Sequence, residues 1–154
     1  MKKRIIIING PNLNLLGFRE PDIYGSCSWE DFFPQLRDAF KDSAEFTHFQ
    51  SNSEGEIIDR IHQARGSDTP VHGIIINPGA YSHYSLAIAD ALAAVKIPAI
   101  EVHISNIMAR ESQRKTCVTA ASCIGMICGL GLDGYRFAAE AILSMNQEKS
   151  ENGY

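Results

Sequence analysis

Apolar runs of strand length alternate with segments of helical periodicity along this chain, and the alternation restricts the folds open to it. The clearest run is residues 4–9, which contains four consecutive isoleucines. Such β-branched runs are typical of strands that are buried on both faces. Strands separated by helices pair in parallel, because a parallel neighbour requires a crossover connection. The sequence therefore predicts an α/β protein.

Four more strands and four helices complete the predicted pattern. The strands are expected at residues 46–50, 71–77, 99–104 and 123–128. The helices are expected at 28–43, from the capping box at 53–56 to Gly66, at 82–94 and at 134–145. We expect a flavodoxin-like fold, a doubly wound five-stranded parallel sheet with helices on both faces. Residues 1–146 are expected to form one domain, and 147–154 a polar, frayed tail.

Charge and hydropathy exclude several classes of partner. The 154 residues include 14 Lys and Arg against 18 Asp and Glu, and no basic stripe that would attract nucleic acid. The longest apolar run near either end is residues 5–8, far below the roughly 20 residues of a membrane helix. The polar segment 9–12 interrupts the apolar stretch that an export signal needs. We expect a cytoplasmic protein without membrane or nucleic-acid partners.

The sequence gives no support for metal, nucleotide or serine-hydrolase chemistry. The four cysteines, Cys27, Cys117, Cys123 and Cys128, contain no C-x-x-C pair and are interpreted as reduced packing residues. Residues 129–134 fit G-x-G-x-x-G, but no further strand with an acidic residue follows, so close helix-to-strand packing explains these glycines better. No phosphate loop, nucleophile elbow or H-E-x-x-H motif occurs. We expect neither a cofactor nor a metal.

The loop after the first strand is long and contains a candidate base. Ligands of doubly wound sheets bind beyond the carboxyl ends of the strands, so this loop lies at the expected site. Gly17 and Gly25 bracket it, which is compatible with a mobile lid or with a plain surface loop that has a packed tyrosine at its base. Tyr24 is a poor base unless a cation favours its phenolate, and Arg19 on the same loop could supply that charge.

Two histidines follow the third and fourth strands. Glu101 and His103 are two residues apart on a strand and share a face, so they form either an oriented proton donor or a buried structural pair. His83 stands near a helix start, where it could face an anion or only cap the helix. The backbone amides of residues 104 and 105 could meet a carboxylate. Arg110 and Arg114 could simply be solvated.

Long sequence blocks resemble the type II 3-dehydroquinate dehydratases. The blocks are INGPNLNLLG at 8–17, REP at 19–21, YG at 24–25, QSNSEGE at 50–56, INPGAY at 76–81 and EVHISN at 101–106. The resemblance implies reversible loss of water from 3-dehydroquinate to give 3-dehydroshikimate through an enolate, in aromatic amino acid biosynthesis. It implies no cofactor, and assembly as a homododecamer built of trimers.

The resemblance also implies a role for each matching residue. Tyr24 would be the base, assisted by Arg19, and Asn12 would hold the enolate through a water. His103 would protonate the departing hydroxyl, oriented by Glu101. The residues implied in substrate binding are Asn77, His83, Ile104, Ser105, Arg114 and, at a neighbouring subunit's site, Asp90.

The segment 106–117 departs from the family pattern. Many members read close to N-I-H-x-R-E-P-F-R-H-H-S, whereas this chain reads NIMARESQRKTC and so ends in Cys117. Tyr84 also stands where a smaller Thr is frequent.

The alternative to an enzyme is a noncatalytic module on the same fold, such as a receiver domain or a flavin carrier. Asn9 and Asn77 stand where a receiver needs acidic residues, which argues against the receiver.

Overall fold

A computed structural model of the chain, which describes residues 1–18 and 20–151, contains one five-stranded sheet. Its strands are β1 Lys3–Asn9, β2 Ala44–Gln50, β3 Gly73–Asn77, β4 Ala99–His103 and β5 Gly125–Cys128. All neighbours pair in parallel in the order β2-β1-β3-β4-β5. This is the flavodoxin-like order, so the predicted fold class is confirmed. The winding direction reverses between β1 and β3.

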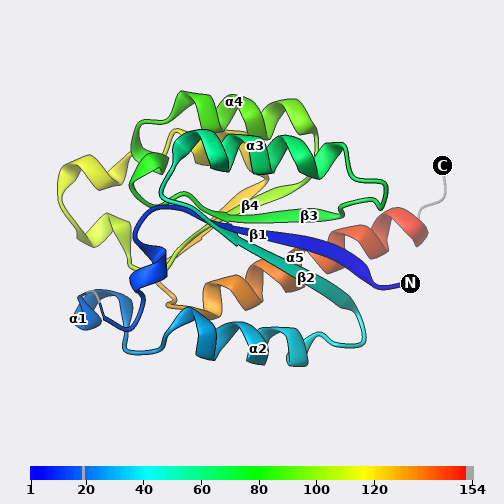
Figure 1. Ribbon diagram of the computed structural model, residues 1–154, viewed down its shortest axis with the longest axis horizontal. Helices are drawn as coiled ribbons and strands as arrows, with labels where there is room; N and C mark the ends of the chain where they lie inside the picture. The colour runs from blue at the N-terminus through cyan, green and yellow to red at the C-terminus, as the bar shows by residue number, and fades with distance from the viewer. Residues whose placement is uncertain (19, 152–154) are drawn as a thin grey trace.

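Helices cover both faces of the sheet. They are α1 Pro21–Tyr24, α2 Trp29–Ala39, α3 Glu54–Arg65, α4 Leu86–Val95 and α5 Asp133–Glu151. In Figure 1, α3 and α4 lie on one face of the sheet, whereas α2 and α5 lie on the other. Short 3₁₀ turns join the remaining segments: η1 Leu13–Leu15, η2 Gly79–His83, η3 Ile107–Ala109, η4 Ser112–Lys115 and η5 Thr119–Ser122.

The isoleucine run of β1 holds the two helical layers together. Ile5 and Ile7 pack in the core that contains α2 and α5, while Ile6 and Ile8 pack in the core that contains α3 and α4. The alternation follows from the period of two along a strand. Each isoleucine is at most 3% exposed, and full burial contributes roughly 1.5–3 kcal/mol per side chain. The run therefore fixes β1 as a central strand.

Serine caps fix where three helices begin. Ser28 and Ser53 cap α2 and α3 as predicted, each accepting a hydrogen bond from the backbone N–H three residues later. The third predicted helix starts in the wrong place. Ser85 caps α4 by accepting from the N–H of Ile88 at 3.1 Å, so the helix begins at Leu86 and the preceding residues form η2. Two serines three residues apart compete as caps, and the sequence analysis chose the earlier.

Several other boundaries move by a few residues. β3 begins at Gly73 rather than residue 71, and β5 at Gly125 rather than residue 123. The last helix continues beyond residue 145 to Glu151, so most of the segment predicted as a tail has helical backbone. Residues 152–154 lie outside the described residues.

The glycine-rich segment at 129–134 serves turn geometry and packing. Gly129 and Gly131 have positive φ angles of 85° and 60°, which favour glycine. A Cβ on Gly134 would lie 3.1 Å from the Val102 side chain, so α5 packs closely on β4 here. This confirms the packing interpretation of the motif.

No helix among the described residues is long and apolar enough to cross a membrane.

Candidate active site

A cleft lies at the carboxyl ends of β1, β3 and β4, beside the reversal of winding. Its lining residues come from the loops after these strands and from the end of α1. They are Pro11, Asn12, Leu13, Tyr24, Asn77, Gly79, Ala80, His83, His103, Ile104, Ser105, Ile107, Arg110 and Arg114. The sequence analysis placed ligands at these strand ends, and its candidates Asn12, Tyr24, Asn77, His83, His103, Ile104, Ser105 and Arg114 meet here.

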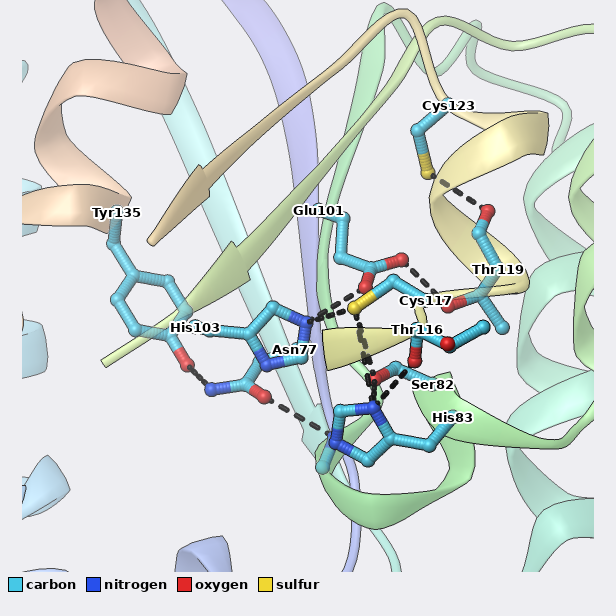
Figure 2. Close-up of polar contacts among 11 residues, drawn as sticks. Asn77, Ser82, His83, Glu101, His103, Thr116, Cys117, Thr119, Cys123 and Tyr135 are labelled. Carbon is cyan, nitrogen blue, oxygen red and sulfur yellow. Dashed lines mark hydrogen bonds and ion pairs between the residues drawn. The ribbon is translucent and has the colours of Figure 1, made fainter. Parts of the chain in front are cut away.

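Glu101 and His103 form a buried pair on β4, with the cleft on the histidine side. His103 Nε2 donates to Glu101 Oε1 at 2.7 Å, and Thr119 Oγ1 donates to Glu101 Oε2 at 2.6 Å (Figure 2). Glu101 is fully buried and lies behind His103 rather than in the cleft wall. Because a carboxylate accepts the Nε2 proton, His103 keeps one orientation and Nδ1 is the nitrogen left for a ligand.

Tyr24 has a cationic partner that the sequence analysis did not select. Arg110 Nη1 donates to the Tyr24 hydroxyl at 2.7 Å, and the guanidinium carbon lies 5.6 Å from the ring centroid. The Arg110 side chain is only 14% exposed, so the interpretation of Arg110 as a solvated residue is wrong. A largely buried guanidinium that donates to a phenol oxygen stabilises negative charge on that oxygen. Arg19, the predicted partner, lies outside the described residues.

Asn12 lines the cleft in a left-handed backbone conformation. Its φ is 67°, which asparagine tolerates better than most residues. The Asn12 N–H donates to Asn52 Oδ1 at 3.0 Å, and the Tyr81 hydroxyl donates to the Asn52 carbonyl at 2.8 Å. The loop 50–56, quoted as a sequence block, therefore supports the Asn12 turn.

A buried network that the sequence analysis missed fixes Asn77. Asn77 Nδ2 donates to the Tyr135 hydroxyl at 3.1 Å, while Asn77 Oδ1 accepts from the N–H of Gly79. Tyr135, at the start of α5, in turn donates to Asn9 Oδ1 at 2.8 Å. Burial raises the pKa of the Tyr135 phenol, so it remains a donor. No local sequence signal linked α5 to two strand ends.

His83 and Arg114 also line the cleft. His83 Nδ1 donates to the Thr116 carbonyl at 2.7 Å, which leaves Nε2 for other contacts. The His83 ring stacks near His103, with centroids 6.0 Å apart. Arg114 Nε donates to Glu111 at 2.7 Å, so the carboxylate directs the arginine.

Asp90 is the predicted binding residue that the cleft does not contain. It is exposed on α4 and is not among the residues that line the cleft.

The assembled groups suit proton transfer to and from a polar anion. A phenol paired with a guanidinium can remove a proton, and an imidazole paired with a carboxylate can deliver one. Amide, imidazole and guanidinium groups around them can bind carboxylate and hydroxyl groups. The arrangement is that of a general acid–base enzyme.

Comparison with known proteins decides the family. The family model described as "Dehydroquinase class II" matches residues 3–143. The chain belongs to the class II dehydroquinase family. A 3-dehydroquinate dehydratase from Lachnoclostridium phytofermentans is 55% identical over 144 residues, covering 93% of this chain and 98% of that protein. One from Caldicellulosiruptor saccharolyticus is 55% identical over 141 residues, covering 91% and 96% respectively.

Solved structures of this family share the fold. The type II dehydroquinase from Butyrivibrio crossotus superposes with a TM-score of 0.88 at 48% sequence identity, covering 92% of this chain and 97% of that one. The resemblance inferred from the sequence blocks is thus confirmed at the level of class II dehydroquinases.

Proposed function

We propose that this class II dehydroquinase catalyses the reversible dehydration of 3-dehydroquinate to 3-dehydroshikimate through an enolate, as a hydro-lyase of the shikimate pathway. The observation that carries the proposal is the single cleft that contains both Tyr24, paired with Arg110, and His103, paired with Glu101. Relatives that are 55% identical are named 3-dehydroquinate dehydratase, which supports the same substrate.

Tyr24 is the base in this proposal. As a phenolate it removes the proton next to the substrate ketone, and the Arg110 guanidinium stabilises that phenolate from 2.7 Å. Arg19 assists in the same way. The ketone delocalises the resulting carbanion as an enolate, so the protein supplies a base, an acid and donors to the oxyanion without a cofactor. Asn12 holds the enolate oxygen through a water.

His103 is the acid. Its imidazolium, with Nε2–H held by Glu101, gives the Nδ1 proton to the departing hydroxyl, and water leaves. Glu101 acts through His103 and is therefore a positioning residue.

Binding of the substrate falls to the remaining cleft residues. The Ile104 and Ser105 amides receive the carboxylate, Arg114 contacts a ring hydroxyl, and Asn77 and His83 position the substrate. Asp90 reaches a neighbouring subunit's cleft in a dodecamer built of trimers, and its exposure on α4 supports this. Native mass spectrometry tests the assembly. We place the enzyme in the cytoplasm, as befits a biosynthetic role.

The test is a direct assay. Protein mixed with 3-dehydroquinate should produce the ultraviolet absorbance of the conjugated enone product. Prior borohydride treatment should leave the rate unchanged, because the enolate route has no lysine Schiff base to reduce. Absence of the absorbance change would reject the proposed substrate, and inactivation by borohydride with substrate would reject the enolate route.

A further inference from the structure

A thiol stands beside the proposed acid. Cys117 Sγ lies 3.9 Å from His103 Nε2, 3.7 Å from Ser82 Oγ and 4.0 Å from His83 Nδ1. Figure 2 shows the sulfur between the two imidazole rings, with Glu101 next to it. One ligating atom each from Glu101, His103 and Cys117 falls within 4.8 Å of the others. Among the described residues, this is the group of metal-ligating side chains that comes closest together.

The donor set and its spacing suit a tetrahedral, thiophilic ion. Thiolate, imidazole and carboxylate are the ligands that Zn²⁺ takes in proteins, at about 2.0–2.3 Å, which places neighbouring donor atoms roughly 3.3–3.6 Å apart. The 3.9 Å between Sγ and Nε2 would shorten slightly, and the 2.7 Å between Nε2 and Oε1 would lengthen. Ser82 Oγ or a water offers a fourth ligand. Small side-chain shifts would therefore bring the three donor atoms to the spacing of a tetrahedral Zn²⁺ site.

Charge also favours a cation at this position. Glu101 is fully buried, and the hydrogen bonds to its two oxygens come from His103 and Thr119. A buried carboxylate gains from a nearby positive charge. His83 Nδ1 faces the Thr116 carbonyl and so does not serve as a ligand.

Covalent modification is the weaker interpretation of the thiol. Burial, with a further contribution from the charge of Glu101, raises the pKa of the Cys117 thiol, although a hydrogen bond with Ser82 opposes this. A protonated thiol is a poor nucleophile, whereas a metal ion displaces the thiol proton on binding. The neighbouring Cys123 does not share the group, and burial raises its pKa to about 12.

We propose that Glu101, His103 and Cys117 bind Zn²⁺ or a similar thiophilic divalent ion, and that the bound ion inhibits the enzyme. On binding, the Cys117 thiol proton leaves to solvent, and the His103 proton moves from Nε2 to Nδ1. A metal on Nε2 takes the place of the proton that Glu101 accepts, so His103 loses the hydrogen bond that orients it as the proposed acid. The inhibitory part rests on the proposed role of His103, while the binding part does not. The site depends on Cys117, which stands where the family pattern has serine.

Binding is tested with Co²⁺ as a spectroscopic substitute for Zn²⁺. Titration of the folded wild-type protein should produce a sulfur-to-cobalt charge-transfer band with tetrahedral d–d bands. Cys27→Ser, which removes an exposed thiol, should keep both, whereas Cys117→Ser should lose the charge-transfer band. An unchanged band in Cys117→Ser, or no band in the wild type, would overturn the site.

A second measurement needs no variant and so survives a folding defect in Cys117→Ser. Zn²⁺ should protect Cys117, but not Cys27, from alkylation read by mass spectrometry of the native protein. Under conditions that alkylate Cys117 fully in the metal-free protein, equal alkylation with and without Zn²⁺ would reject the site.

Inhibition is then measured by the enone assay. Zn²⁺ should slow dehydration, and EDTA should restore the rate. Cys117→Ser, compared with its own metal-free rate, should need at least about tenfold more Zn²⁺ for the same inhibition. Even a residue that only supports a metal ligand contributes roughly 10–100-fold to metal affinity. If the protein shows the sulfur-to-cobalt band but has no dehydratase activity, the proposed function is rejected and the metal site is retained. An active enzyme that binds Co²⁺ through Cys117 but ignores Zn²⁺ would reject the inhibition alone.

Discussion

The Tyr24–Arg110 hydrogen bond joins residues 86 positions apart, and it changes how the base is understood. Arg19 is close to Tyr24 along the chain and was therefore predicted as the cation that assists it. Arg110 was left among solvated residues because nothing in a polar segment marks which arginine turns inward. Pairing at this distance is set by the return of the chain through η3 to the cleft, which only the tertiary structure reveals.

The first prediction concerns Tyr24→Phe. The variant should fold normally, because it removes one hydroxyl from a half-buried side chain, and turnover should fall by roughly 100- to 10,000-fold, the usual contribution of general base catalysis. The enone assay measures the rate and circular dichroism checks the fold. Tyr84→Phe, at a tyrosine that is 62% exposed outside the cleft lining, is the matched control and should keep the wild-type rate. Most of the activity remaining in Tyr24→Phe would remove Tyr24 from the role of base.

A second prediction separates the charge of Arg110 from its packing. Arg110→Ala should lower kcat, because negative charge on the Tyr24 oxygen loses its adjacent cation during proton transfer. Arg110→Lys keeps the charge and should recover part of the lost kcat. Arg136→Ala, at a partly exposed arginine on α5, controls for loss of a positive charge elsewhere. If kcat of Arg110→Ala matches the wild type, the adjacent cation does not assist Tyr24.

At the scale of elements, Tyr135 ties α5 to the ends of β1 and β3. The phenol bridges Asn9 and Asn77, 126 and 58 positions away in sequence, and its ring packs edge-on against Trp29 with centroids 4.9 Å apart. Tyr135→Phe keeps the ring but leaves two buried amide groups without this partner. We expect a loss of about 1–3 kcal/mol in the free energy of unfolding.

Urea unfolding measures that loss, and enzyme kinetics tests its link to the cleft. Because Asn77 lines the cleft, KM in Tyr135→Phe should rise more than kcat falls. Phe137→Leu, on the same helix at a residue that is 37% exposed, is a control for general weakening of α5. Unchanged stability would mean that other donors or waters satisfy the two asparagines.

Element boundaries were predictable where the local signal was unique. The caps Ser28 and Ser53 gave the starts of α2 and α3 because their hydrogen bonds are made within three residues. The start of α4 was predicted wrongly because Ser82 and Ser85 offer the same local chemistry. Ser82 is instead buried beside Cys117, a tertiary contact that leaves Ser85 as the cap.

At the scale of the whole molecule, the sheet order was predictable and the side-chain partners were not. Alternating strands and helices leave few right-handed topologies, and the reversal of winding locates the cleft. Glu101 and His103 were paired correctly because they share a strand face. Arg110, Tyr135 and Cys117 were missed because each reaches the site from a distant segment, and their approach depends on how the layers pack.

The stability of the whole molecule should depend on pH through His48. This histidine packs against Trp29 and Phe33, and its Nε2 accepts from Asn9 Nδ2 at 3.2 Å, so it belongs to the network that ends at Asn77. Burial lowers the pKa of His48 from 6.5 to about 4, against a small opposing effect of Glu30.

A depressed pKa in the folded state fixes the sign of this dependence. Above pH 6.5 both states hold a neutral imidazole, and the full stability is present. As the pH falls from 6.5 to about 4, the unfolded chain gains a proton that the folded protein rejects, so stability is lost across this window. Acidification from pH about 7.5 to about 4.5 should therefore lower the free energy of unfolding by about 2–3 kcal/mol through His48.

Urea unfolding at both pH values measures this loss. His48→Gln keeps an acceptor for Asn9 and should lose less stability on acidification by that amount, because it cannot take up the proton, whereas the exposed His62→Gln controls for loss of a histidine. Equal acid losses in His48→Gln and the wild type would mean that carboxylates alone produce the acid sensitivity and that His48 is protonated without cost.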